Sequence, residues 1–117
     1  MKVIIIGSNG QDGFYLSKIL ERNKIDFLCI SRSGNCINGD VGNYNFISKY
    51  IKEYQPSHIF NFAANSTTQH SVLFENHQTI STGTLNILES VRLNCINAKV
   101  FITGSALQFQ NKELPKY

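Results

Sequence analysis

The chain begins with a four-residue apolar run, Val3–Ile6, that leads directly into a glycine-rich stretch, Gly7–Gly13. A continuous apolar run bounded by glycine is typical of a parallel strand that is buried on both of its faces. Apolar residues at helical spacing follow at once. The sequence therefore predicts a strand, a tight turn and the start of a helix in immediate succession, as in an alternating α/β fold.

Glycine occupies every third position of this stretch. Glycines let the backbone turn tightly and approach a ligand closely, and the helix N-terminus that follows offers unpaired N–H groups and positive partial charge. Together these features predict a cradle for a pyrophosphate group. The candidate binding residues are Gly7, Asn9, Gly10, Gln11, Asp12 and Gly13. Two plainer interpretations stay open: a tight turn that binds nothing, and an Asp12 that only complements the helix dipole.

Further apolar runs and periodic segments predict that strands and helices alternate along the chain. The strands are expected at Val3–Ile6, Phe27–Ile30, Ile59–Phe62 and Val100–Ile102, and the helices at roughly Gln11–Asn23, Phe46–Tyr54 and Asn76–Asn94. The residues expected to face inward are Leu16, Ile19 and Leu20 in the first helix and Ile80, Thr84, Ile87, Leu88 and Val91 in the last. Loops are expected at Ser31–Asn43 and Ala63–Ser71.

This alternation predicts a doubly wound parallel sheet of the Rossmann type, with helices on both faces and right-handed crossovers. In such a sheet, ligands bind outside the carboxyl ends of the strands. The loops that follow the four predicted strands are therefore the places where binding residues are expected.

The composition excludes several other classes of protein. A chain of 117 residues supports one domain with a core, and its apolar runs are too short to span a bilayer. The N-terminus lacks the pattern of a signal peptide. The net charge is only +3 and no cluster of Lys and Arg exceeds a pair, so neither a nucleic-acid partner nor a membrane partner is expected.

The usage of cysteine and histidine argues against disulfides and against a metal centre. Cys29, Cys36 and Cys95 fit neither a zinc-ligand spacing nor a secreted disulfide framework, so reduced thiols in a cytoplasmic protein are expected. The three histidines have no neighbouring cluster of carboxylates or thiolates, so no metal is expected.

The loop after the second predicted strand holds a cation where NAD-binding units usually hold an acid. Ser31 and Arg32 occupy this position. The charge and planar donors of an arginine suit a 2′-phosphate, which favours NADP over NAD; a solvated surface arginine is the alternative. Asp40 and Val41 follow Gly39 in the same loop. Asp40 is expected to accept a hydrogen bond from an adenine amino group, or else to cap the helix that begins nearby.

The loops after the last two predicted strands are built from small residues. Ala63, Ala64 and Ser66 let the backbone approach the central part of a cofactor, although a packed turn would use the same residues. Ser105 follows the last strand and is placed to hydrogen-bond a substrate hydroxyl during hydride transfer. A serine that only caps a turn is the alternative there.

Taken together, these motifs resemble the extended short-chain dehydrogenase/reductase family, which contains the nucleotide-sugar epimerases and dehydratases. The motifs are GSNGQDGFYL at 7–16, SR at 31–32, GDV at 39–41, NFAANS at 61–66, GTLNILES at 83–90 and FITGS at 101–105. The resemblance implies the strand order 3-2-1-4 for the first four strands, NADP with NAD as the alternative, and a nucleotide-sugar substrate for the full-length parent. It also implies that Ser105 is the active-site hydroxyl.

The chain departs from this family's pattern at the catalytic residues. The family's Tyr-x-x-x-Lys pair is missing, Leu107 stands where the dehydratases have a general-base glutamate, and Ile80 replaces an asparagine. The sugar-binding C-terminal domain of the family is also expected to be absent from residues 1–117. Residues 1–117 are therefore expected to form a partial dinucleotide-binding domain that does not turn over sugar by itself.

A sheet of these four strands alone is expected to have its last predicted strand at an edge. Unpaired N–H and C=O groups on such a strand invite pairing with another chain. Self-association through Lys99–Thr103 is therefore expected, with the C-terminal tail exchanged between chains. Three other hypotheses stay open for the molecule as a whole: an epimerase or reductase parent, a non-catalytic nucleotide-binding module, and an α/β scaffold in which the glycines serve only the fold.

Overall fold

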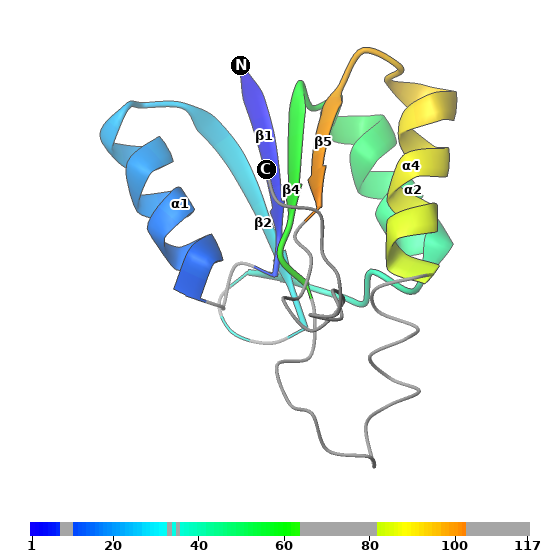
Figure 1. The fold of residues 1–117 in the computed structure, drawn as a ribbon, viewed down its shortest axis with the longest axis horizontal. Coiled ribbons are helices and arrows are strands. Elements are labelled where there is room, and N and C mark those ends of the chain that lie inside the picture. The colour runs from blue at the N-terminus through cyan, green and yellow to red at the C-terminus, as the bar shows by residue number, and fades with distance from the viewer. Residues whose placement is uncertain (8–10, 33, 35, 64–81, 103–117) are drawn as a thin grey trace, which may run out of the picture.

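The computed structural model describes residues 1–7, 11–32, 34, 36–63 and 82–102. Its elements are β1 (Lys2–Ile6), α1 (Gln11–Arg22), β2 (Asp26–Ser31), β3 (Ile37–Asn38), α2 (Tyr44–Tyr54), β4 (His58–Asn61), α4 (Gly83–Asn94) and β5 (Lys99–Ile102). The strands form one sheet in the order β3-β2-β1-β4-β5, and each neighbouring pair is parallel. The predicted doubly wound parallel sheet is confirmed (Figure 1).

The expected order 3-2-1-4 is also confirmed, but the identity of the third strand differs from the prediction. Residues Ile37–Asn38, which lie inside the predicted loop, pair with the end of β2. The segment predicted as the third strand is β4, and it lies beside β1. The last predicted strand is therefore β5. A two-residue strand shows no hydrophobic periodicity, so the pattern could not reveal it.

The sheet is covered on both faces, with α1 on one side and α2 and α4 on the other (Figure 1). Successive side chains of a strand point to opposite faces. Accordingly, Ile4 and Ile6 of β1 join the core under α2 and α4, whereas Val3 and Ile5 pack with Leu20 of α1. The four side chains of Val3–Ile6 are at most 2% exposed, which confirms that the opening apolar run is a strand buried on both faces.

Two of the predicted inward-facing residues point outward instead. Ile19 of α1 is 50% exposed and Leu88 of α4 is 46% exposed. The buried residues of α4 are Gly83, Asn86, Ile87, Ser90 and Val91. The inner face of α4 was predicted from its apolar residues alone. The orientation of the helix instead buries two polar residues, Asn86 and Ser90, and leaves Leu88 exposed.

Helix α2 has well-defined ends. The side chain of Asn43 accepts a hydrogen bond from the backbone N–H of Phe46 at 3.2 Å, which satisfies one of the first-turn donors. At the other end, Gln55 adopts a left-handed conformation with φ of 51° and its N–H donates to the carbonyl of Ile51. Pro56 follows and is buried, so the predicted end of this helix is confirmed.

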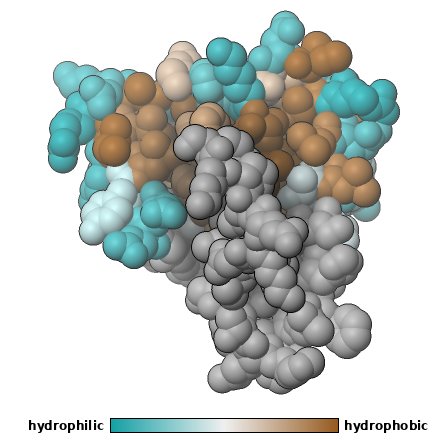
Figure 2. Space-filling view, in the orientation of Figure 1, coloured by the Kyte–Doolittle hydropathy of each residue, from teal (hydrophilic) through white to brown (hydrophobic). Residues whose placement is uncertain are grey.

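Several large apolar side chains remain on the surface of the two outer layers. Figure 2 shows hydrophobic side chains exposed over both α1 and α4. The most exposed of these are Phe14, Tyr15 and Ile19 on α1 and Leu85, Leu88 and Leu93 on α4. Among the described residues, no helix combines the length and the hydrophobicity needed to cross a bilayer.

Candidate functional site at the carboxyl edge of the sheet

The carboxyl ends of the parallel strands meet at one edge of the sheet, and α1, α2 and α4 begin at that edge (Figure 1). This topology gathers residues from the segments that follow four different strands. The described candidates at the edge are Gly7, Gln11, Asp12 and Gly13 after β1, Arg32 after β2, Asp40 and Val41 after β3, and Ala63 after β4. The candidates Asn9, Gly10, Ala64, Ser66 and Ser105 lie outside the described residues.

Gly7 lies between the ends of two neighbouring strands. Its N–H donates to the carbonyl of Ile30 at 2.8 Å, and its φ is +83°. A Cβ at this position would lie 2.7 Å from the backbone of both Phe62 and Ala63. Because no side chain fits in that space, only glycine lets the chain leave β1 in this direction toward α1.

The first turn of α1 presents polar groups at the same edge. Gln11 and Asp12 are exposed, whereas Gly13 is buried. The backbone N–H groups of a first helical turn have no partner within the helix and carry positive partial charge. This geometry fits a bound phosphate, and it equally fits an Asp12 that complements the dipole, so both interpretations of Asp12 remain predictions.

The cation and the acid predicted for the second loop both lie at this edge. Arg32 directly follows the buried Ser31 and is exposed. The carbonyl of Ser31 accepts a hydrogen bond from the N–H of Gly39 at 2.9 Å, which ties the end of β2 to the segment after β3. Arg32 and Asp40 therefore follow two paired strand ends.

Asp40 does not cap α2, as one interpretation of the sequence had it. The cap is Asn43. Asp40 instead forms a turn: its Oδ1 accepts from the N–H of Gly42 at 2.9 Å, and its carbonyl accepts from the N–H of Asn43 at 3.0 Å. Among the described residues, nothing else pairs with the Asp40 carboxylate, which is exposed and leaves Oδ2 as an open acceptor.

Val41 has a different place from its neighbour. Its side chain is 4% exposed and belongs to the core. Its carbonyl accepts a hydrogen bond at 2.9 Å from the side-chain amide of Asn86, a buried residue of α4. If Val41 contacts a ligand, it therefore does so through its backbone. Sequence reasoning missed Asn86; the available signal was a polar residue within the expected inner face of a long helix.

The chain turns immediately after β4. The N–H of Phe62 donates to the carbonyl of Ile6 at 2.7 Å, and the N–H of Ala63 donates to the side-chain oxygen of Asn61 at 3.0 Å. Asn61 is only 3% exposed, so its side chain organises the turn from inside. The half-buried Ala63 fits both a packed turn and a close approach to a ligand.

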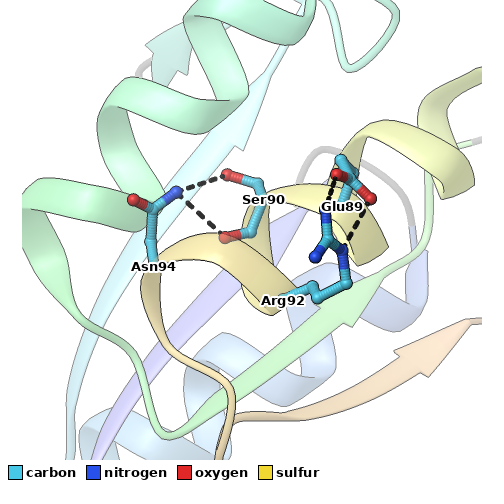
Figure 3. Close-up of polar contacts among 4 residues, drawn as sticks. All are labelled: Glu89, Ser90, Arg92 and Asn94. Carbon is cyan, nitrogen blue, oxygen red and sulfur yellow. Dashed lines mark hydrogen bonds and ion pairs between the residues drawn. The ribbon is translucent and has the colours of Figure 1, made fainter.

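Two further pairs of polar side chains on α4 lie within the helix, Glu89 with Arg92 and Ser90 with Asn94 (Figure 3). Arg92 donates two hydrogen bonds to the carboxylate of Glu89, and this pairing lowers the pKa of Glu89. The amide of Asn94 donates to the carbonyl of Ser90 at 2.9 Å. Within the described ranges, no three His, Cys, Asp or Glu side chains gather into a possible metal site.

The chain matches the model of the NAD dependent epimerase/dehydratase family over residues 3–115. The chain belongs to this family. The family resemblance inferred from the motifs is thereby confirmed. Among curated relatives, GDP-mannose 4,6-dehydratase of Yersinia enterocolitica is 28% identical over 124 aligned positions, which cover 84% of this chain and 33% of the relative. The chain thus spans about one third of that relative's length.

Solved structures show the same fold. The enzyme WbmG of Bordetella bronchiseptica in complex with NAD has a TM-score of 0.81 at 17% identity, covering 92% of this chain and 38% of that one. UDP-glucose 4-epimerase of Thermus thermophilus in complex with NAD has a TM-score of 0.69 at 19% identity, covering 80% and 34%. L-threonine dehydrogenase of Clostridium difficile has a TM-score of 0.77 at 25% identity, covering 89% and 36%.

Proposed function

We propose that this chain is the cofactor-binding portion of an NADP-dependent enzyme that modifies a nucleotide-sugar, similar to GDP-mannose 4,6-dehydratase. The observation that carries the proposal is the position of Gly7. Its backbone is held between two strand ends and leads into the N-terminus of α1 at the same edge as Arg32 and Asp40. Membership in the epimerase/dehydratase family and the partial likeness to that dehydratase support it.

The residues at the edge fit a dinucleotide in chemical character. The first-turn N–H groups of α1 suit the pyrophosphate, Arg32 suits a 2′-phosphate, and the open carboxylate oxygen of Asp40 suits an adenine amino group. Ala63 is small enough for its backbone to approach the central part of the cofactor. The other proposed contacts are Asn9, Gly10, Gln11, Asp12, Gly13, Val41, Ala64 and Ser66. When bound, the dinucleotide would supply the hydride acceptor.

NADP is proposed over NAD because of Arg32, although several structurally similar enzymes were solved with NAD. An acidic side chain after β2 would accept from the ribose hydroxyls of NAD, and this chain has a cation there. NAD therefore remains the alternative cofactor, and the charge at residue 32 is what distinguishes the two.

We propose that residues 1–117 do not turn over sugar alone. Ser105 would hydrogen-bond a substrate hydroxyl, but the sequence contains no Tyr-x-x-x-Lys pair to move the proton. Leu107 stands where the dehydratases have a general-base glutamate, and leucine cannot carry a proton. An epimerase or reductase parent is therefore the second candidate function, after the dehydratase. A nucleotide-binding module without chemistry is the remaining alternative.

Titration calorimetry of the chain with NADPH, NADH and ATP tests the proposal. NADPH is expected to bind most tightly. Arg32→Glu replaces an attraction to the 2′-phosphate by a repulsion. The substitution should therefore lower the affinity for NADPH by about 10- to 100-fold and leave the affinity for NADH nearly unchanged. Arg22→Glu is the matched control, because Arg22 is an exposed arginine in the last turn of α1, away from the edge.

Other results would redirect the proposal. If Arg32→Glu lowered the affinities for NADPH and NADH equally, Arg32 would not bind the 2′-phosphate. Equal binding of all three nucleotides would favour a nucleotide-binding module, and no binding of any of them would leave only the scaffold hypothesis.

A further inference from the structure

A buried hydrogen bond joins α4 to the loop that carries Asp40. The side-chain amide of Asn86 donates to the carbonyl of Val41 at 2.9 Å, across 45 positions of sequence. Asn86 is 7% exposed and Val41 is 4% exposed. A bond shielded in this way is costly to lose, because the carbonyl would be left buried without a donor.

The backbone of α4 approaches the same loop residue closely. A Cβ on Gly83 would lie 2.7 Å from Cγ1 of Val41, so glycine at this position lets the first turn of α4 rest on the Val41 side chain. Gly83 and Asn86 are three positions apart and lie on the same side of the helix. Together they hold Val41 by its side chain and by its carbonyl.

Asp40 is adjacent to this anchored residue. Its Oδ1 is engaged by the N–H of Gly42, and its carbonyl by the N–H of Asn43 at the start of α2. The direction of the open oxygen of Asp40 therefore depends on a short turn, residues 40–43, that is attached to α2 at one end and to α4 through Val41.

We propose that Asn86 is a positioning residue for the acid at the edge of the sheet. Its side chain reaches the predicted cofactor site only through the backbone carbonyl of Val41. By holding the Val41 carbonyl, it keeps the turn 40–43 in the conformation in which Asp40 accepts from the amino group of an adenine base. This inference rests on the proposed function, and it assigns Asn86 to recognition of the base rather than of the phosphates.

The test compares the chain with its Asn86→Ala variant in two measurements. The first is titration calorimetry with NADP and with its hypoxanthine analogue, in which a carbonyl oxygen replaces the adenine amino group. The wild-type chain should prefer NADP by about tenfold, because Asp40 would face an acceptor in the analogue. Asn86→Ala should abolish this preference, so that the ratio of the two affinities falls to about one.

The second measurement needs no ligand. Amide hydrogen exchange should show faster exchange of the Gly42 N–H in Asn86→Ala, because the turn that holds this N–H against Asp40 is released. The amides of β1 should keep their protection, which shows that the variant is folded.

Asn94→Ala is the matched control. It removes the same amide group from the same helix, but the bond that it breaks runs to the carbonyl of Ser90 within α4. This variant should keep both the adenine preference and the slow exchange of Gly42.

The outcomes separate this inference from the proposed function. If Asn86→Ala is folded and keeps both the adenine preference and the protection of Gly42, the positioning role is wrong, whatever the cofactor. If the wild-type chain binds neither dinucleotide, the proposed function fails, and the adenine role of Asn86 fails with it. If Asn86→Ala is too unstable to titrate, the less disruptive Asn86→Ser, whose hydroxyl is too short to reach Val41, is measured by the same two criteria.

Discussion

Gly7 lies where the carboxyl ends of β1, β2 and β4 come together. Its N–H bonds to the end of β2, and its α-carbon lies against the backbone that leaves β4. A positive φ and a close approach both require glycine here, and the two requirements have separate costs. The glycine pattern predicted a tight turn, and the structure adds that the turn is also a packing contact between strands.

Gly7→Ala should therefore lower the free energy of unfolding by about 2–4 kcal/mol, the sum of the backbone strain and the clash with Phe62 and Ala63. Urea denaturation followed by circular dichroism measures the change. Gly34→Ala is the control, because Gly34 also has a positive φ, of 90°, but is exposed. If the two substitutions cost the same, the close packing at Gly7 contributes nothing to stability.

At the scale of an element, β5 is the outermost strand on its side of the described sheet. Phe101 of β5 stacks on Phe60 of β4 with ring centroids 5.3 Å apart, yet it is 64% exposed. An apolar edge strand of this kind pairs readily with a second chain. The predicted self-association through Lys99–Thr103 remains a proposal, and Thr103 lies outside the described residues.

Phe101→Lys should shift the chain toward monomer, because a charged residue on an edge strand opposes pairing. Light scattering at micromolar concentration measures the effect. Leu93→Lys, at an exposed leucine of α4, is the matched control and should leave the association unchanged. A wild-type chain that is already monomeric at these concentrations would rule the association out. If Leu93→Lys also gave monomer, the contact would lie on the helices instead.

At the scale of the whole molecule, two groups with raised pKa values lie at the ends of α2 and α4, opposite the candidate site. Burial raises the pKa of the Cys95 thiol. Burial, with a contribution from the nearby carboxylate of Asp26, raises the pKa of the Tyr54 hydroxyl. In both cases the folded chain holds the proton more tightly than the unfolded chain does.

This difference predicts that stability falls at alkaline pH. The two groups contribute fully below their ordinary pKa values of 9.0 and 10.0, and the contribution is lost as the pH rises through the raised values. Urea midpoints at pH 7, 9 and 11 measure the decline. It should be shallower in the double variant Cys95→Ala with Tyr54→Phe. An unchanged decline in that variant would assign the alkaline sensitivity to other groups.

The sequence by itself determined the alternation of strands and helices, the parallel sheet and the family, because apolar runs, helical spacing and glycine turns are local signals. It also predicted which loops carry Gly7, Arg32 and Asp40. Only the tertiary structure decided the strand Ile37–Asn38, the outward rotation of Ile19 and Leu88, and the bond from Asn86 to Val41. These features depend on which distant segments come into contact, and a local pattern does not encode a contact across 45 positions.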